Sequence, residues 1–340
     1  MSTALDDFVA LKDETTFGTQ VTPDRAYPFV DGTEGDWQPQ IRSGAGVFGG
    51  NGRTTVRASR TFLASGRGVV TVKAELESRA GGVLFRQALG VGAATAITGG
   101  GFILAHTQVT NLVLPSSTIQ IAKVRNDGVY RVETFRGCTA MKTTIEQPQN
   151  DIPTIEVEFD ALGWTTATAA ITPSYATTSN LYDAMHQTIG YGGTLTAPTA
   201  TALASGLTAV TNWRSWKLEI DQAGNDDGWV LNGGTRSQPK VGMPTIKLTG
   251  ELEWNDNVVP DAYTAGTMNP WYATWTHPTE LVSAVPAALQ VVIPRLIITK
   301  GNPQVKPGEA PRMLSIEGEA RNDGVNRDLY VAYRTQDTAL

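Results

Sequence analysis

Apolar and polar residues alternate in several stretches of the chain, most clearly from 69 to 77. Positions 70, 72, 74 and 76 are apolar, whereas Thr71, Lys73, Glu75 and Glu77 stand between and after them. A period of two predicts a β-strand with one apolar face and one charged face. Similar patterns at 213–220 and 243–253 predict equivalent strands. Further strands are predicted at 118–124, 129–136, 138–146, 153–160, 289–299, 311–320 and 328–334.

Other segments depart from this period. Residues 82–90 and 258–266 each end on a glycine, Gly90 or Gly266, which is typical of a short helix. Residues 42–68 are rich in glycine and arginine and predict a long hairpin with a glycine tip. Residues 1–30 show no clear period and predict an extended arm, with a turn at Thr22-Pro23.

The two halves of the chain repeat one order of elements. Each contains an alternating strand that ends in Glu-Leu-Glu, then a short helix, and later a strand with alternate glutamates: Glu156 and Glu158, then Glu317 and Glu319. One such pair is common on any solvent-facing strand, but two pairs in the same order favour a duplication. We therefore predict a first β unit at 1–165, a connector at 166–210, in which short strands are possible, and a second β unit at 211–340.

The composition favours an all-β sandwich or barrel. Threonine and glycine are abundant, and only 18% of the residues are charged. A net charge of -6 provides no overall attraction to nucleic acid or anionic membranes. One cysteine, Cys138, cannot form an internal disulfide. The chain shows neither a signal-peptide pattern nor an apolar run near the roughly 20 residues of a membrane-spanning helix, which predicts a cytoplasmic site of synthesis and no membrane partner.

Candidate chemistry is sparse. His106, His186 and His277 lack the spacing of metal ligands, and Cys138 has no neighbouring base, so no metal or cofactor is predicted. Glutamates two residues apart on a strand lie about 6.6–7 Å apart, within the roughly 6.5–9.5 Å of an inverting glycosidase. That reaction also needs a buried carboxyl group, whereas these faces are predicted to be solvated. We therefore expect a structural protein rather than an enzyme.

Three motifs carry a resemblance to a known family. Residues 11–19 read Leu-Lys-Asp-Glu-Thr-Thr-Phe-Gly-Thr, residues 114–119 read Leu-Pro-Ser-Ser-Thr-Ile, and Gly-Glu-Leu-Glu at 250–253 precedes Asp-Ala-Tyr-Thr-Ala-Gly at 261–266. In this order the chain resembles the tail tube (major tail) proteins of long-tailed, non-contractile phages. The tryptophan-rich segment at 271–275 and Pro260 within the predicted helix depart from the family pattern.

The resemblance implies a β-sandwich with a flanking helix, whose sheets join between subunits into a ring. Stacked rings would form a tube through which viral DNA passes without sequence-specific binding. Members with one β unit form six-membered rings, so a duplicated chain predicts a trimer with pseudo-sixfold symmetry, and a hexamer is the alternative. The implied partners are other copies, the tape measure protein and tail terminator or tip proteins, and the implied location is the virion tail, after synthesis in the host cytoplasm.

Carboxylates that line such a tube would repel DNA phosphates. The candidates are Glu75, Glu77, Glu251 and Glu253, with Glu156, Glu158, Glu317 and Glu319 less favoured. Lys73 and Lys247 share these faces and would weaken the negative lining. The alternative is that these glutamates face outward to solvent.

The hairpin at 42–68 is basic, because no acidic residue occurs between Asp36 and Glu75. We expect it to reach an adjacent ring and to pair with acidic groups there through Arg42, Arg53, Arg57, Arg60 and Arg67. The alternative function is a β-rich adhesin or glycan-binding module. In that case Trp213, Trp216, Trp271 and Trp275 would stack on sugars.

Overall fold

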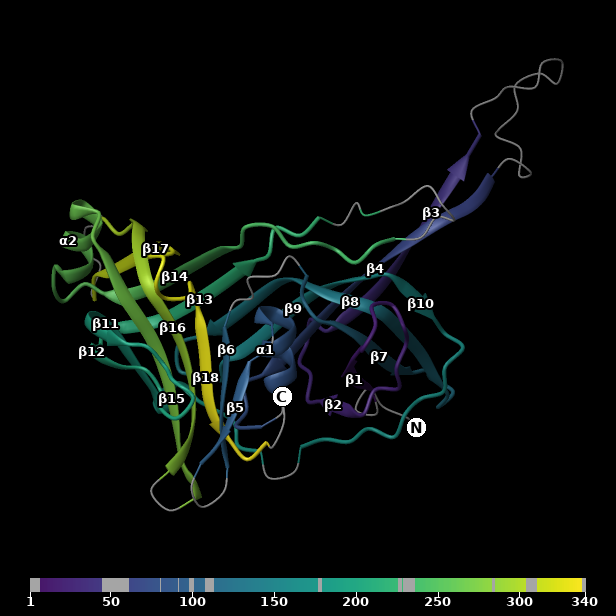
Figure 1. The fold of residues 1–340 in the computed structure, drawn as a ribbon, viewed down its shortest axis with the longest axis horizontal. Helices are drawn as coiled ribbons and strands as arrows, with labels where there is room; N and C mark the ends of the chain where they lie inside the picture. The colour runs from purple at the N-terminus through teal and green to yellow at the C-terminus, as the bar shows by residue number, and fades with distance from the viewer. Residues whose placement is uncertain are drawn as a thin grey trace.

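The computed structural model describes residues 7–44, 61–79, 81–90, 92–97, 101–107, 113–176, 179–225, 228, 236–282, 285–303 and 311–337. These residues form eighteen β-strands and two short α-helices, together with a 3₁₀ turn at Ala184–His186 (Figure 1). All strand pairings are antiparallel and join the strands into one network. The predicted mainly β class with short flanking helices is confirmed.

The first half contains ten strands. They are β1 (Phe8–Asp13), β2 (Arg25–Tyr27), β3 (Glu34–Ser43), β4 (Thr61–Glu75), β5 (Ala93–Ala96), β6 (Phe102–Thr107), β7 (Ser116–Val124), β8 (Tyr130–Gln147), β9 (Thr154–Ala161) and β10 (Gly163–Thr165). Seven of them pair in the order β2–β1–β7–β8–β9–β4–β3. The short β10 pairs with β8, on the side that β9 also occupies.

The second half repeats this series of pairings. Its strands are β11 (Gln187–Thr196), β12 (Ser205–Val210), β13 (Trp213–Asp221), β14 (Thr245–Glu253), β15 (Met268–Val282), β16 (Val285–Lys300), β17 (Met313–Ala320) and β18 (Tyr330–Thr335). Seven of them pair in the order β12–β11–β15–β16–β17–β14–β13. As β10 pairs with β8, so β18 pairs with β16. The hairpin of β5 and β6 joins this network through β18.

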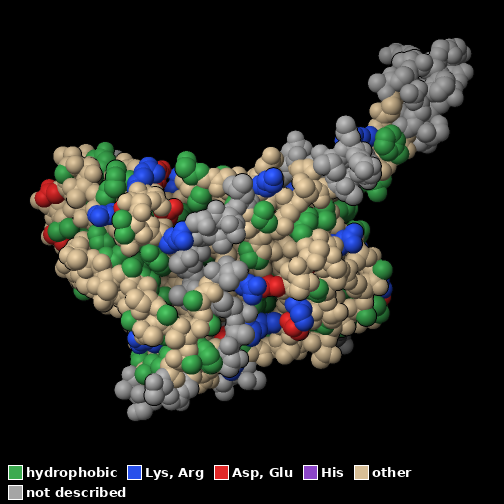
Figure 2. Space-filling model, viewed as in Figure 1, with side chains coloured by type: hydrophobic (Ala, Val, Ile, Leu, Met, Phe, Trp, Pro, Cys, Tyr) green, Lys and Arg blue, Asp and Glu red, His purple; other side chains and the backbone are tan. Residues whose placement is uncertain are grey.

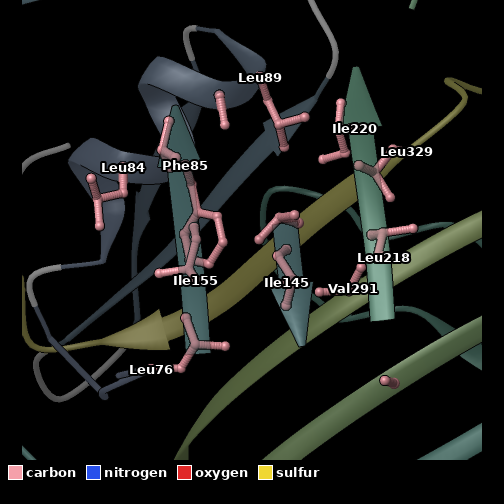
Figure 3. Close-up of a cluster of buried hydrophobic side chains, with 14 of the residues drawn as sticks. Leu76, Leu84, Phe85, Leu89, Ile145, Ile155, Leu218, Ile220, Val291 and Leu329 are labelled. Carbon is pink, nitrogen blue, oxygen red and sulfur yellow. The ribbon is translucent and has the colours of Figure 1, made fainter. Parts of the chain in front are cut away.

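Two strand pairings join the halves into a continuous sheet, that of β6 with β18 and that of β8 with β13. The long strand β8 extends beyond the end of β7 and there pairs with β13, from Lys142 opposite Asp221 to Gln147 opposite Trp216. A single cluster of buried hydrophobic side chains spans both halves. Figure 3 shows part of it, with Ile145 of β8 beside Leu218 of β13. The halves therefore share both a sheet and a core.

Both predicted helices are present. Helix α1 (Gly82–Leu89) is followed by Gly90 at φ 115°, and α2 (Val258–Ala265) ends on Gly266 in the left-handed region at φ 61°. A glycine carries no penalty there, which explains why each helix stops at that point. Figure 3 shows Phe85 of α1 directed toward Ile155 of β9, so this helix covers the apolar face of the sheet.

The predicted extended arm at 1–30 is wrong for the residues that the structure describes. Strand β1 pairs with β2 on one side and with β7 on the other, and its residues Phe8 to Leu11 are all buried. A strand covered on both faces has no reason to alternate apolar and polar residues. Its sequence therefore contained no period that could reveal it.

The predicted connector at 166–210 is too long. Strands β11 and β12 lie within it, and β11 pairs with β15, so both strands belong to the second half. The connector is therefore confined to 166–186. Strands predicted separately at 129–136 and 138–146 form the single strand β8. Gly137 between them adopts φ 64°, and a Cβ there would lie 2.7 Å from the Cβ of Leu162. The chain thus bends at Gly137 without ending the strand.

The predicted hairpin at 42–68 begins earlier than expected. Strands β3 and β4 pair from Glu34 opposite Thr71 to Ser43 opposite Thr61, with one irregularity near Gln40. The predicted glycine tip at 44–52 lies, apart from Gly44, outside the described residues. Figure 1 shows the paired strands projecting from the body, and residues 37–43 and 61–67 are called the arm below.

Candidate functional site

Six neighbouring strands form a wall whose two faces differ sharply. Their order is β4–β9–β8–β13–β14–β17, so the wall takes three strands from each half. Val72, Val157, Ile145, Leu218 and Leu248 point to the buried side. The alternate residues point the other way, and this opposite side is called the polar face.

The strand registers align the polar residues into rows across both halves. One row runs from Lys73 through Glu156, Thr144, Glu219 and Lys247 to Glu319. A second row contains Thr71, Glu158, Lys142, Asp221 and Thr245, and a third contains Glu75, Thr154, Glu146, Lys217, Thr249 and Glu317. Glu251 lies beyond these rows, between Ser215 and Ser315. The three rows and Glu251 together contain nine carboxylates and four lysines, a surplus of five negative charges.

Lysines moderate this surplus through ion pairs. Lys217 Nζ lies 2.7 Å from Glu219 Oε1, and Lys142 Nζ lies 3.9 Å from Glu158 Oε1. The hydrogen bond from Lys217 lowers the pKa of Glu219, and the same bond raises the pKa of Lys217. Such partly exposed pairs are worth about 0–1 kcal/mol each. They orient the side chains on the face more than they stabilise the fold.

The predicted lining glutamates divide into two groups. Glu75 and Glu251 lie on the polar face, together with the less favoured Glu156, Glu158, Glu317 and Glu319. Glu77 lies beyond the end of β4, in an isolated bridge with Leu181. Burial raises the pKa of Glu77. Glu253, the last residue of β14, is on the same side of the strand as Glu251, and its carboxylate pairs with Arg214.

Three carboxylates of the polar face, Glu146, Glu219 and Asp221, were missed by the sequence prediction. Glu146 and Glu219 lie opposite residues of β13 and β8, at the joint of the two halves. Both stand at alternating positions of predicted strands, so the period that revealed Glu75 was present there as well. The prediction relied on the Glu-x-Glu repeat, to which neither glutamate belongs.

The arginines predicted to pair with an adjacent ring have different surroundings in the structure. Arg42 lies at the exposed end of β3, whereas Arg67 Nε lies 2.8 Å from Asp160 Oδ1 within the same chain. Arg236 pairs with the same carboxylate, and both Asp160 and Arg236 are almost fully buried. Neither Asp160 nor Arg236 was singled out from the sequence. Arg53, Arg57 and Arg60 lie outside the described residues.

The tryptophans of the alternative glycan-binding function are not available as a stacking surface. Trp216, Trp271 and Trp275 are buried, with Trp216 5.1 Å from Trp271 and 5.5 Å from Trp275 between ring centroids. Trp213 packs on Trp271 at 6.1 Å. These rings form part of the core of the second half.

Other reactive groups are buried or few. Cys138 is fully buried, and burial raises the pKa of its thiol well above the ordinary value. His186 and His277 form a pair with 4.9 Å between ring centroids. Among the described residues, no group of three or more His, Cys, Asp or Glu side chains is arranged to hold a metal ion. No helix in the described part of the chain has the length and apolar character needed to span a membrane.

Comparison with known proteins identifies the family of the chain. No curated protein matches the chain. A family model described as phage tail tube protein matches residues 5–320, which is nearly the whole chain. The chain belongs to the phage tail tube protein family, whose members are structural components of the phage tail.

Proposed function

We propose that copies of this chain close into rings, that the rings stack into the tail tube, and that DNA passes along the polar face during ejection. The observation that supports this most directly is the continuity of the polar face across the two halves of one chain. The wall has an apolar buried side and a charged polar face, so its polar face can line a channel that holds water and DNA. The protein acts through this assembled surface and not through a catalytic site.

We propose a ring of three chains with pseudo-sixfold symmetry. The series of strand pairings occurs twice per chain, so three chains supply six similar units. Within one chain the units join through the pairing of β8 with β13 and through that of β6 with β18. Among the described strands, β3 pairs with β4 alone and lies at the end of the first series of pairings. Because free edges invite further strand pairing, a closed ring is the arrangement that removes them.

The charge of the polar face then assists the passage of DNA. Phosphates near the face meet more carboxylates than lysines, so the net interaction is repulsive. Salt limits this repulsion to about 8–10 Å, and only residues on the lining itself contribute. The lysines lower the repulsion and keep neighbouring carboxylates paired. A lining of this kind lets DNA slide without sequence-specific contacts.

The remaining assembly contacts are proposed from the family role. The arginines of the hairpin tip, Arg53, Arg57 and Arg60, pair with acidic groups of an adjacent ring, while Arg67 remains with Asp160. The tape measure protein and the tail terminator or tip proteins are the other partners in the virion tail. Synthesis takes place in the host cytoplasm, and no cofactor takes part.

Electron microscopy of the purified protein tests the architecture. Tubes whose rings contain three chains are expected, and rings of six chains would overturn the duplicated-unit proposal. Deletion of 44–52 should leave rings or monomers that do not form tubes. Normal tubes from that deletion would contradict a stacking role for the hairpin tip.

A charge variant tests the lining. Glu75→Gln combined with Glu251→Gln removes two charges from the polar face of each chain. The matched control, Asp24→Asn with Glu280→Gln, removes two exposed carboxylates elsewhere. Both proteins should form tubes, but only the first should change the rate of DNA ejection from phage that carry it. Equal ejection rates for wild type, variant and control would refute the proposed lining.

A further inference from the structure

The two helices occupy corresponding places but differ in burial. Helix α1 follows β4 and packs on β8, and α2 follows β14 and packs on β16. In α1 most residues are buried, including Leu84, Phe85 and Leu89. In α2 only Val259 and Ala262 are buried. The second helix therefore lacks a cover that the first one has.

Part of the cover of α1 comes from the other half of the chain. It is the connection between β13 and β14, of which residues 222–225, 228 and 236–244 are described. Gln222 Nε2 donates to the carbonyl oxygen of Ala88 in α1 at 2.6 Å. Gln238 Nε2 donates to the carbonyl oxygen of Leu114 at 2.7 Å, and Arg236 binds Asp160. The β13–β14 connection of the second half thus packs across the first half.

The arm occupies the corresponding place in the first half. It is the outer part of β3 and β4, beyond the residues of β4 that pair with β9. Instead of lying on a neighbour it projects from the body, as Figure 2 shows. Ile41, Phe62 and Leu63 on it are 67%, 59% and 65% exposed, and Ile41 stands opposite Leu63 across the two strands. Large apolar side chains grouped in this way mark an interaction surface.

A receiving surface lies at the opposite end of the molecule. Figure 1 shows α2 at one end of the long axis and the arm at the other. Next to α2 is a hollow of about 360 Å³, bounded by Tyr263, Lys300, Asn302 and Leu314 among others. Val258 and Tyr263 of α2 are 52% and 38% exposed. This surface, α2 with its hollow, is called the α2 surface.

Charge also matches between the two surfaces. The arm carries Arg42 and belongs to a segment without acidic residues between Asp36 and Glu75. The α2 surface has the exposed carboxylates Asp256 and Asp261, and Figure 2 shows acidic side chains at that end of the body. The arm is therefore basic and apolar, and the α2 surface is apolar with two exposed carboxylates, beside a lysine, Lys300, that is paired with Glu317. Because the two surfaces lie at opposite ends, they cannot meet within one chain and suit a head-to-tail contact between copies.

We infer that the α2 surface of each copy is covered by the arm of the next copy in the same ring. Ile41 and Leu63 pack against Tyr263 and the hollow beside it, in the way that the β13–β14 connection covers α1. Among the described strands, the pairing of β15 with β16 ends at Ile297. The last residues of β16, next to α2, therefore have no described partner strand on that side. This inference rests on the proposed assembly into rings, and it identifies which surfaces of the chain meet.

A crosslinking experiment tests the contact. Leu63→Cys and Tyr263→Cys are combined in one chain, and assembled protein is treated with a short bismaleimide. Because Cys138 is buried, only the introduced thiols react. The monomer band should be lost into covalent dimers and closed trimers. The matched control, Leu63→Cys with Tyr175→Cys, places the second thiol on an exposed residue of the connector between the halves and should stay monomeric.

The outcomes separate this inference from the proposed function. Tubes that form normally but show no more crosslinking than the control would overturn the inference and leave the tube function intact. A covalent ladder that continues past the size of one ring would place the contact between rings and also overturn it. Absence of rings and tubes in the wild-type protein would instead reject the proposed function.

A second measurement covers the case in which the double variant does not assemble. Hydroxyl-radical footprinting compares wild-type monomers with wild-type tubes. Phe62 and Tyr263 should both become less oxidised on assembly, while Tyr175 keeps its reactivity. Unchanged oxidation of Tyr263 in tubes would contradict the inference without any substitution in the chain.

Discussion

A buried ion cluster at Asp160 links the two halves, and its contribution to the free energy of unfolding can be measured by substitution. Asp160 of β9 receives Arg67 from β4 and Arg236 from the connection between β13 and β14. The Arg236 side chain is 2% exposed, so it cannot turn to water if its partner is removed, whereas the Arg67 side chain is 39% exposed. Asp160→Asn keeps the size of the side chain and removes only the negative charge.

The expected loss follows from the burial of Arg236. Removing one partner of a buried ion pair leaves an uncompensated charge and costs roughly 3–5 kcal/mol. Arg67 adds little to this loss, because water can solvate its exposed guanidinium. Replacing Arg236 as well, with Arg236→Met, removes the unpaired charge. The double variant should therefore regain most of the stability that Asp160→Asn alone loses.

Urea unfolding of the unassembled chain measures both changes. The matched control is Glu158→Gln, two residues away on the same strand, where the carboxylate is partly exposed and 3.9 Å from Lys142. That pair should contribute only about 0–1 kcal/mol. If Asp160→Asn unfolded at the same urea concentration as Glu158→Gln, the cluster would not hold the halves together. Failure of Arg236→Met to restore stability would show that unpaired charge is not the cause.

Three further predictions concern single groups. Burial, and less strongly His186, lower the pKa of His277 below its ordinary 6.5, so its contribution to stability is complete above pH 6.5 and is lost as the pH falls through the lowered value. An NMR titration should find this lowered pKa, and an unchanged value in His186→Gln would exclude a charge effect between the rings. The Cys138 thiol should not react with Ellman's reagent in the native protein and should react fully in urea, and rapid native labelling would contradict its burial. The Glu14 carboxylate accepts four hydrogen bonds, from Thr118, Gly137, Gly18 and Ser116. Glu14→Gln should cost about 1–3 kcal/mol in thermal or urea unfolding, because the amide opposes two of these donors, and wild-type stability would argue against this role.

Local sequence determined much of the secondary structure. Where one face of a strand is buried and the other is solvated, the residues must alternate, and this is why β4, β13 and β14 could be predicted. Gly90 and Gly266 stop the helices because positive φ angles favour glycine, and this effect acts within a few residues. The same alternation correctly placed Glu75 and Glu251 on a charged face.

Only the tertiary structure decided which of these faces meet. Strand β1 is covered by the rest of the fold on both faces, so its burial depends on partners far along the chain and leaves no local period. Asp160 and Arg236 are 76 residues apart, and nothing in either neighbourhood marks them as a pair. The polar face exists as one surface because β8 pairs with β13, a contact between halves that alternation cannot specify. Residue patterns record whether a side chain meets water or core, whereas the partner it meets is set by how the whole chain packs.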